Sequence, residues 1–227
     1  PNWQALAARA QPPRAIRLSA EGQEFSPSDA RLSGESALRE GKVGMILVAG
    51  GQGTRLGFPH PKGMFPLGPI SHRTLFQLLI DRLLAVARRY GVRIPLYLMT
   101  SPATHAETVS FLHKHRQFGL PHEDLMVFCQ GLMPAVDARS FKVLLAGPGS
   151  LVLGPDGHGG MLAALDRSGG LADARRRGLA HLFYGQVDNP LLPVCDPLLI
   201  GYHCLARAEM TTQVVRKQDP LDRVGNV

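Results

Sequence analysis

Met45–Gly63 reads MILVAGGQGTRLGFPHPKG, and the rest of the fold is organised around this stretch. An apolar run typical of buried strands leads directly into a loop crowded with glycines, in which Arg55 and then Lys62 follow. Closely spaced glycines let a ligand approach the main chain and accept hydrogen bonds from backbone N–H groups, and phosphate is the usual ligand of this kind. The stretch therefore predicts a nucleotide-binding loop that follows the first central strand.

The glycine spacing matches neither of the two most familiar phosphate loops. A Walker A loop requires Gly-Lys-Ser/Thr after the glycines, whereas Gly53 is followed by Thr54 and Arg55. The dinucleotide fingerprint G-x-G-x-x-G requires a third glycine where Leu56 stands, and the glycine comes one residue later, at Gly57. A different class of nucleotide-binding protein is indicated.

Composition is typical of a globular protein without membrane or secretory features. The 227 residues are 44% hydrophobic, which suffices for a sizeable core. No uninterrupted apolar run approaches the roughly 20 residues that cross a bilayer, and the amino end lacks the apolar region of a signal peptide. The cysteines at 129, 195 and 204 are odd in number and have no C-x-x-C spacing, so we expect buried thiols rather than disulfides or a zinc site. We expect a soluble, cytoplasmic protein without a membrane partner.

The net charge of +7 favours an anionic ligand. The basic residues are scattered and no aromatic-interleaved pattern accompanies them, so we expect no nucleic-acid partner. The one dense run, Arg175–Arg177, lies near the end of a predicted helix, and its simplest interpretation is a solvated helix terminus that the helix dipole favours. An anionic nucleotide substrate accounts for the same excess of positive charge.

Apolar patterns after residue 40 alternate between strands and helices. This alternation predicts an α/β fold with a mainly parallel sheet, helices on both faces and a ligand crevice at the carboxyl ends of the strands. We expect residues 1–40 to form an irregular or helical arm and residues 41–227 to form the nucleotide-binding domain. The predicted strands are Gly44–Ala49, Pro95–Thr100, Leu125–Cys129, Leu182–Gly185 and Met210–Val215, and the predicted helices are Thr74–Arg89, Ala103–His115 and Pro197–Ala206.

The residues that directly follow each strand are expected to line this crevice. Gln130 follows the third strand, and Asp188 follows the fourth. A lone aspartate after a strand is usually a turn or cap residue, but Asp188 is expected opposite the glycine loop, where a magnesium ion that bridges phosphate oxygens needs a protein ligand. For Ser101, which ends the second strand and precedes a proline, we favour a helix cap over a ligand role.

A second glycine-rich segment, Pro155–Gly160, reads PDGHGG and precedes a short predicted helix, after a predicted hairpin in residues 144–154. Glycines in this position let the backbone approach a flat base or a ribose. The alternative is a glycine turn that only caps the helix. The histidines show no metal-binding spacing, and neither H-E-x-x-H nor G-x-S-x-G occurs, so the commonest hydrolase classes are not indicated.

Five motifs occur in the order found in the sugar-nucleotide pyrophosphorylases, and the form with Gln52 and a short spacer resembles the eukaryotic-type UDP-N-acetylhexosamine pyrophosphorylases. The resemblance covers residues 41–227 and implies a GT-A-like, Rossmann-related nucleotidyltransferase fold. It also implies a reaction in which the phosphate of a sugar 1-phosphate attacks the α-phosphorus of UTP, giving a UDP-sugar and pyrophosphate. The motifs are GGQGTRLG at 50–57, PKGM at 61–64, Q-G-x-x-P at 130–134, PDG-x-GG at 155–160 and VDN at 187–189.

The same resemblance implies roles for individual residues. Arg55 and Lys62 are expected to be catalytic, because they neutralise the triphosphate and the leaving pyrophosphate, and Asp188 is expected to bind Mg²⁺. His158 is expected to face the ribose or the sugar, at a position where the N-acetylhexosamine enzymes carry asparagine, and this departure leaves the sugar open. The expected nucleotide-binding residues are Ala49, Gly50, Gly51, Gly53, Thr54, Gln130 and Gly157.

Two alternatives stay open beside a uridylyltransferase for N-acetylglucosamine 1-phosphate. One is a UTP–glucose-1-phosphate uridylyltransferase, and the other is a non-catalytic nucleotide-sensing module that kept the loop and lost the chemistry. Because the chain begins with proline and stops at Val227, we expect it to be truncated at the carboxyl end, with the sugar pocket encoded further on. The sequence gives no indication of the oligomeric state.

Overall fold

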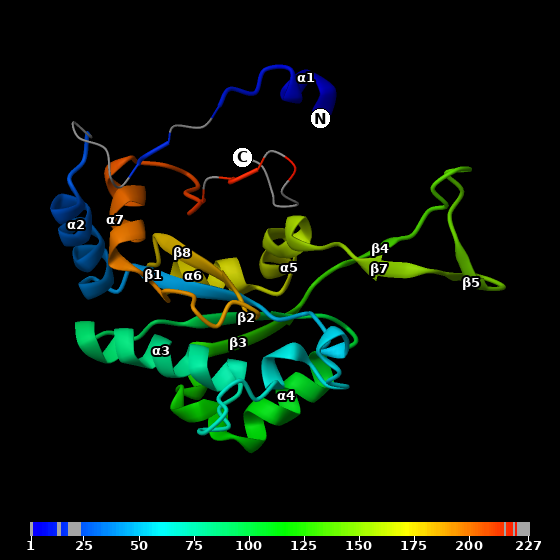
Figure 1. The fold of residues 1–227 in the computed structure, drawn as a ribbon, viewed down its shortest axis with the longest axis horizontal. Coiled ribbons are helices and arrows are strands. Elements are labelled where there is room, and N and C mark those ends of the chain that lie inside the picture. Colours follow the sequence, from blue (N-terminus) through cyan, green and yellow to red (C-terminus); the bar gives the residue numbers. More distant parts are fainter. Residues whose placement is uncertain (1, 13–14, 18–23, 216, 220, 222–227) are drawn as a thin grey trace.

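The computed structural model describes residues 2–12, 15–17, 24–215, 217–219 and 221, so parts of the predicted amino-terminal arm lie outside the described residues. Its centre is a four-stranded sheet in which every pairing is parallel, in the order β3-β2-β1-β8 (Figure 1). The predicted α/β class is confirmed. The strands of this sheet are β1 (Val43–Val48), β2 (Leu96–Thr100), β3 (Leu125–Cys129) and β8 (His181–Gln186).

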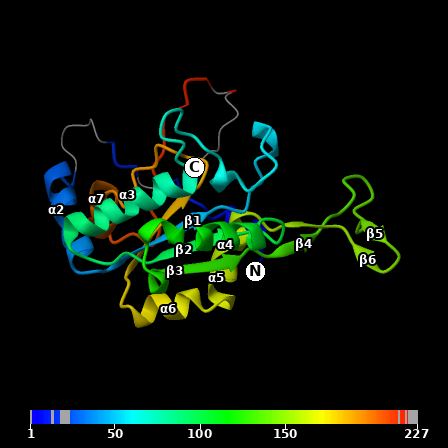
Figure 2. The same ribbon diagram turned by 90° about the horizontal axis from the view of Figure 1, so that it is seen from below.

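The strand order reverses next to β1. From β1 the chain adds β2 and then β3 on one side, whereas β8 pairs with the opposite side of β1. Helices α3 (Leu75–Tyr90) and α4 (His105–Lys114) lie over one face, and α5 (Met161–Arg167) and α6 (Gly170–Arg176) lie over the other (Figure 2). Open parallel sheets bind ligands at the carboxyl ends of the strands where the order reverses, here between β1 and β8.

Strand β1 is buried from Val43 to Leu47. Successive side chains of a strand point to opposite faces, so continuous burial means that both faces of β1 are covered. Met45 and Leu47 belong to the larger core beneath α3, whereas Ile46 packs in a second core beside Met161 of α5. Burying one such aliphatic side chain contributes about 1.5–3 kcal/mol. The continuous apolar run in the sequence thus becomes the central strand of the domain.

Helices α2 (Pro27–Arg39) and α7 (Pro197–Leu205) pack against each other beside the sheet (Figure 1). Their backbones approach so closely that a Cβ atom placed on Gly201 would lie 1.5 Å from the carbonyl oxygen of Ala30. Gly34 faces the backbone of α7 at a similarly short distance. Glycine at the crossing is therefore required by packing, and α2 ties the end of the predicted amino-terminal arm to the domain.

An extended arm leaves the domain between β3 and α5 (Figures 1 and 2). Strand β4 (Leu132–Pro134) pairs antiparallel with β7 (Leu153–Pro155), and β5 (Leu145–Gly147) pairs with β6 (Ser150–Leu151) at its far end. The predicted hairpin in this region is therefore present. Large apolar side chains on the arm are exposed, and Phe141 shows 78% of its surface.

The remaining elements are short, and no helix within the described ranges is both long and apolar enough to cross a membrane. Helix α3, which carries much of the larger core, is well bounded: Thr74 caps it by accepting from the N–H of Gln77, and Gly91 ends it with a φ of 67°. The other elements are α1 (Trp3–Ala7) and the 3₁₀ helices η1 (Thr54–Leu56), η2 (Lys62–Met64), η3 (Arg116–Gly119), η4 (His122–Asp124) and η5 (His158–Gly160).

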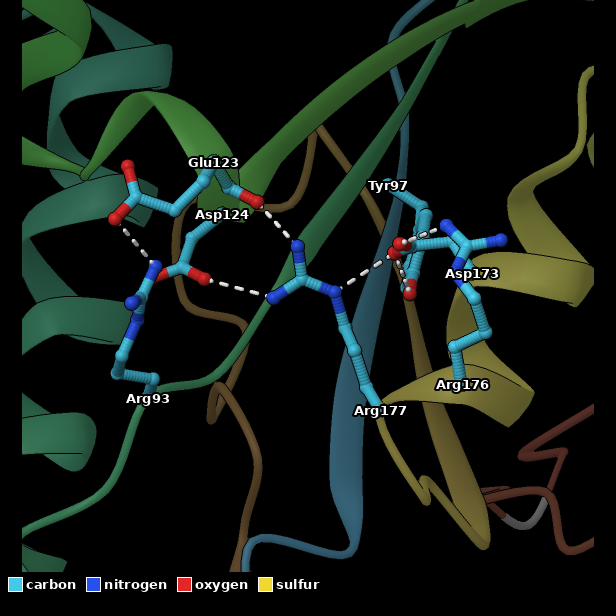
Figure 3. A network of polar contacts seen from close by, with 7 residues as sticks. All are labelled: Arg93, Tyr97, Glu123, Asp124, Asp173, Arg176 and Arg177. Atoms are coloured by element: carbon cyan, nitrogen blue, oxygen red, sulfur yellow. Dashed lines mark hydrogen bonds and ion pairs between the residues drawn. The ribbon is translucent and has the colours of Figure 1, made fainter.

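The sequence predicted a solvated helix terminus for the basic run, but its last arginine belongs to a polar network (Figure 3). The network lies near the amino ends of the strands, which we call the amino edge of the sheet; the carboxyl edge is where the strands end. Arg177 donates from Nε to Asp173 at 2.8 Å and from Nη1 to Asp124 at 3.0 Å. Asp124 also accepts from Nε of Arg93, and Asp173 accepts from the hydroxyl of Tyr97. The prediction failed because Asp124 lies far from Arg177 in the sequence and meets it only through the fold.

The predicted strand at Met210–Val215 is wrong. Within the described residues these positions pair with no other strand, and Val214 and Val215 are 59% and 87% exposed. A valine-rich segment becomes a strand only where a neighbouring edge offers backbone partners and a surface to pack on. The described part of the chain brings no such edge to this segment.

Candidate functional site

The glycine loop follows β1 and closes on itself. The N–H of Gly53 donates to the carbonyl oxygen of His60 at 2.9 Å, and the N–H of Lys62 donates to that of Gly51 at 3.0 Å. The two ends of the loop therefore run antiparallel, with an isolated bridge between Gln52 and Pro61. This closure places Lys62 directly beside the first glycines of the loop.

Two glycines of the loop region are required by close contacts. A Cβ atom on Gly53 would lie 2.8 Å from the ring of Phe58 and 3.0 Å from the carbonyl oxygen of His60. A Cβ atom on Gly63 would lie 2.2 Å from the ring of Phe76, which is fully buried on α3. The glycine of the PKG motif thus lets η2 sit directly on α3, and this contact fixes the residue next to Lys62.

The first amides of the loop have no hydrogen-bond acceptor among the described residues. The hydroxyl of Ser101 donates to the carbonyl oxygen of Gly50 at 2.8 Å, and because the peptide is planar and trans, the N–H of Gly51 points the opposite way. Among the described residues, the N–H groups of Gly50, Gly51 and Gln52 donate no hydrogen bond. This geometry suits an anionic ligand, since backbone N–H groups that face solvent are the donors that phosphate oxygens accept.

Ser101 was expected to cap the helix after β2, and that prediction is wrong. The residue at the N-cap of α4 is Thr104, whose side chain caps nothing and instead bonds to the backbone N–H of Ser101. Ser101 is 7% exposed and orients the loop through Gly50. In the sequence the Ser-Pro pair looks like a helix cap. Its contact with Gly50 could not be predicted, because that residue follows the neighbouring strand and is distant in the sequence.

Gln130 lies against the loop, as the strand-end rule predicted. Its backbone N–H donates to Thr100 at 2.9 Å, and its side-chain oxygen lies 3.0 Å from the point where a Cβ atom of Gly50 would be. Ala49, 1% exposed, is held by a bond from its N–H to the carbonyl oxygen of Met99. The ends of β1, β2 and β3 therefore meet around Gly50.

Lys62 and Asp188 form an ion pair across the point where the strand order reverses. Nζ of Lys62 lies 2.9 Å from Oδ2 of Asp188, and the two side chains are 15% and 48% exposed. Partial burial alone would raise the pKa of Asp188, but the hydrogen bond and charge of Lys62 outweigh it, so the pKa lies below its ordinary value. Asp188 is therefore ionised at neutral pH, and the pair joins the loop after β1 to the end of β8.

Arg55 is not joined to this pair. Thr54 and Arg55 lie on the exposed helix η1, and no ion pair or hydrogen bond of the Arg55 side chain occurs within the described residues. The structure thus brings Lys62 and Asp188 together and leaves Arg55 as a solvated cation on the same loop. Its predicted role in charge neutralisation stays a prediction.

The aspartate of the PDGHGG segment packs against two glycines, and sequence reasoning did not select it. Cβ atoms placed on Gly131 and Gly160 would lie 2.2 and 2.0 Å from Oδ2 of Asp156, so the carboxylate fits between two glycines. Gly157 has a φ of 66° and a ψ of −157°, a conformation that glycine alone adopts readily. The two flanking glycines were the available signal, because each leaves the space that the carboxylate fills.

His158 begins η5 and is exposed, and its Nδ1 is hydrogen-bonded to the hydroxyl of Tyr184. Sequence reasoning missed Tyr184. The only available signal was the alternation along β8, which places Tyr184, Gln186 and the following Asp188 on one face while the intervening residues are buried.

The described residues contain no cluster of three or more histidines, cysteines or carboxylates that could hold a metal ion. Asp188 is the carboxylate at the site, and it is ionised and half exposed. This donor set fits Mg²⁺, which is commonly bound by one or two carboxylates together with substrate phosphates and water. It does not fit a zinc or calcium cage made of protein ligands alone.

Comparison with known proteins agrees with this geometry. Residues 14–227 match the family model described as UTP–glucose-1-phosphate uridylyltransferase. The chain is 38% identical over 195 residues to a UDP-N-acetylglucosamine pyrophosphorylase of Saccharomyces cerevisiae, covering 85% of this chain and 41% of the yeast protein. It is 37% identical over 231 residues to the human UDP-N-acetylhexosamine pyrophosphorylase-like protein 1, covering 98% of this chain and 45% of the human protein.

A solved structure gives the same result. The uridine diphosphate N-acetylglucosamine pyrophosphorylase of Trypanosoma brucei, crystallised with an inhibitor, superimposes with a TM-score of 0.72 at 29% identity, over 80% of this chain and 39% of that one. The chain therefore spans about two fifths of the length of the curated relatives that it matches.

Proposed function

The chain belongs to the UTP–glucose-1-phosphate uridylyltransferase family, and we propose that its protein transfers the uridylyl group of UTP to a sugar 1-phosphate. A phosphate oxygen of the sugar 1-phosphate forms a bond to the α-phosphorus of UTP. The bond from that phosphorus to the oxygen it shares with the β-phosphorus breaks, and pyrophosphate leaves with the electron pair. The products are a UDP-sugar and pyrophosphate.

The observation that carries this proposal is the Lys62–Asp188 pair at the carboxyl ends of β1 and β8. A cation and a carboxylate held 2.9 Å apart beside loop amides that have no acceptor in the described chain supply both charges that nucleotidyl transfer needs. The ammonium neutralises phosphate oxygens, and the carboxylate is available to a divalent cation. A purely structural ion pair would not require the adjoining amides to be free of intramolecular partners.

Each residue of the loop has a separate task in this proposal. The N–H groups of Gly50 and Gly51 bind phosphate oxygens, while Lys62 stabilises the charge that develops on the leaving pyrophosphate. Arg55 supplies a second cation from the exposed side of the loop. Ala49, Gly53, Thr54, Gln130 and Gly157 shape the pocket for uridine, and His158 faces the ribose or the sugar.

We propose that Asp188 binds Mg²⁺ together with the substrate phosphates. When bound, the ion neutralises negative charge on the triphosphate. With Mg²⁺ held by Asp188, Lys62 would be available to contact a phosphate oxygen, because the ammonium group and the metal ion would compete for the same carboxylate. Titration calorimetry should show that Asp188→Asn weakens binding of UTP with Mg²⁺ much more than binding of UTP with EDTA, and equal weakening of both would contradict the metal role.

The sugar is proposed to be N-acetylglucosamine 1-phosphate, because several relatives at 38–39% identity are named for UDP-N-acetylglucosamine. The family description names glucose 1-phosphate, which makes glucose the second candidate. His158 stands where the resembled enzymes carry asparagine. The identity of the sugar therefore rests on the relatives and not on a contact of this chain.

Pyrophosphate release by the full-length protein tests the proposal. UTP and ATP are each offered with the 1-phosphates of N-acetylglucosamine, N-acetylgalactosamine and glucose. We expect turnover with UTP, and faster turnover with N-acetylglucosamine 1-phosphate than with glucose 1-phosphate. A preference for glucose 1-phosphate supports the second candidate. Binding of UTP without pyrophosphate release in the presence of any of the three sugar 1-phosphates would leave a non-catalytic nucleotide-sensing module.

A cytoplasmic location is also proposed. Cys129, Cys195 and Cys204 are free thiols, and burial raises the pKa of Cys195 to about 12, so it stays protonated. Unpaired cysteines are typical of a reducing compartment. Cell fractionation should recover the protein with cytosolic markers, and recovery from secretory vesicles would contradict this location.

A further inference from the structure

Tyr184 lies in the middle of β8, at the edge of the candidate site. It is paired in register with Ile46 of the central strand, so its backbone position is fixed by the sheet. Its side chain is 38% exposed and lies on the same strand face as Gln186 and Asp188. A tyrosine in this place presents its hydroxyl to the site from a rigid element, which is the arrangement that holds another side chain accurately.

The hydroxyl of Tyr184 is hydrogen-bonded to Nδ1 of His158. The two rings meet edge to face, with centroids 6.0 Å apart and an angle of 70° between the planes. The backbone that leads into His158 is held separately, because the N–H of Asp156 donates to the carbonyl oxygen of Gly131 at 3.1 Å. The imidazole is therefore oriented by one element and its backbone by another.

The hydrogen bond has a consequence for the proton on the ring. Burial raises the pKa of Tyr184, so the phenol keeps its proton at neutral pH and has an O–H to donate to the ring nitrogen. When the phenol donates to Nδ1, the neutral imidazole carries its proton on Nε2. His158 then presents an N–H donor on the side of the ring that faces away from Tyr184.

We propose that Tyr184 is a positioning residue that holds His158 as an Nε2–H donor toward a hydroxyl oxygen of the sugar nucleotide. This inference rests on the proposed function. The resembled enzymes carry asparagine at this position, and a carboxamide always has its own N–H donors. A histidine needs a fixed tautomer to do the same task, and Tyr184 supplies it. The hydroxyl belongs either to the ribose or to the transferred sugar.

The tautomer can be measured without any substrate. In protein labelled with ¹⁵N-histidine, NMR should show His158 mainly as the Nε2–H form, with the signal assigned through its absence in His158→Asn. In Tyr184→Phe we expect a mixture of the two tautomers. The same tautomer in both proteins, or an Nδ1–H form in the wild type, would overturn the proposal. Because no turnover is involved, this result is independent of whether the protein is a uridylyltransferase.

Kinetics then separate positioning from folding. Tyr184→Phe removes one hydrogen bond, so we expect it to raise the KM for one of the two substrates about 5-fold with little change in kcat. In the His158→Asn background the second substitution should have no further effect, and additive effects would overturn the proposal. A raised KM for UTP identifies the ribose hydroxyl, a raised KM for the sugar 1-phosphate identifies the sugar hydroxyl, and no change in either contradicts the role.

Tyr202→Phe is the matched control. The hydroxyl of Tyr202 is buried on α7 and has no hydrogen-bond partner within the described residues. Its removal changes the same chemical group outside the site. We expect wild-type KM values and a wild-type His158 spectrum in this variant.

Discussion

The amino and carboxyl edges of the central sheet, where its strands begin and end, both carry charged side chains, but only at the amino edge does a buried carboxylate join two arginines in one network. Asp124 is 2% exposed and lies 2.6 Å from Nε of Arg93 and 3.0 Å from Nη1 of Arg177 (Figure 3). Asp173 completes the network through Arg177 and the hydroxyl of Tyr97. Buried carboxylates with several donors of this kind tie helices to strands, and they leave little for a ligand to bind.

The carboxyl edge is built differently. Lys62 has Asp188 as its ion-pair partner, Asp188 is 48% exposed, and the adjoining amides of Gly50 and Gly51 have no intramolecular acceptor within the described residues. Arg55 adds an exposed cation. Ion pairs alone therefore do not distinguish the two edges. The difference lies in the N–H donors that have no intramolecular acceptor, and on this ground we propose that the nucleotide binds at the carboxyl edge while the amino edge serves stability.

The largest expected effect is on catalysis, at Lys62. Under the proposed function, Lys62→Ala should lower kcat for pyrophosphate release by about 10²–10³-fold, the usual result of removing one preorganised donor. Lys114→Ala, which removes an exposed lysine of α4, is the control and should leave kcat unchanged. Turnover close to wild type in Lys62→Ala would contradict this role, because the Lys62–Asp188 pair would then be merely structural, like the pairs of the amino edge.

The next effect is on stability, at the opposite edge. Asp124→Asn leaves Arg93 and Arg177 without their shared carboxylate and should lower the free energy of unfolding by about 3 kcal/mol, the low end for a broken buried pair because both arginines reach solvent. Urea denaturation measures this loss, and Asp166→Asn, at an exposed carboxylate, should change it by less than about 0.5 kcal/mol. UTP affinity of folded Asp124→Asn should equal that of the wild type, and a large loss of affinity would contradict the division between the edges.

Acid should weaken the amino edge through Asp173. Burial would raise the pKa of this carboxyl, but the hydrogen bonds from Tyr97 and Arg177 outweigh it, so its pKa is lowered from the ordinary 3.8. A lowered native pKa stabilises the fold at pH values above 3.8, and this contribution is lost as the pH falls through 3.8 and then through the native pKa. Unfolding measured between neutral and acid pH should show a steeper loss for the wild type than for Asp173→Asn. Parallel curves would mean that Asp173 contributes nothing by this route.

The smallest effect is expected at an exposed pair near the loop. Nδ1 of His60 lies 2.5 Å from Oε1 of Glu107, with the side chains 49% and 43% exposed. Exposed pairs contribute little, so Glu107→Gln should lower the free energy of unfolding by about 0.5 kcal/mol or less, and high salt should abolish the difference. A decrease in the free energy of unfolding as large as that of Asp124→Asn would show that ion pairs stabilise the carboxyl edge as well.

Much of the fold was predictable because β1 and β2 are buried on both faces and therefore appear as continuous apolar runs, whereas β8 shows an alternating pattern. β1, β2, β3 and β8 all lie close to where the sequence predicted them. The segment at Met210–Val215, which reads MTTQVV, also contains residues that favour strands, yet it forms no strand in the described chain. The composition of a segment shows whether it could form a strand. Whether it does so also depends on a neighbouring strand with free backbone groups, which the sequence of that segment does not show.

The site was predictable where a motif or the strand-end rule applied, and not elsewhere. Gln130 and Gly50 were expected to converge because their strands end at the same edge, and they do. Asp156 and Tyr184 escaped because their importance depends on contacts with residues distant in the sequence. The Arg177–Asp124 bond escaped for the same reason.

Hydrogen exchange of the full-length protein, measured with and without UTP, shows directly which edge of the sheet binds the nucleotide. We expect UTP with Mg²⁺ to slow exchange at the amides of residues 50–57 and at Lys62, whereas the amides around Asp124 and Asp173 keep their rates. Protection confined to the amino edge, or no protection of the glycine loop at saturating UTP, would contradict this expectation.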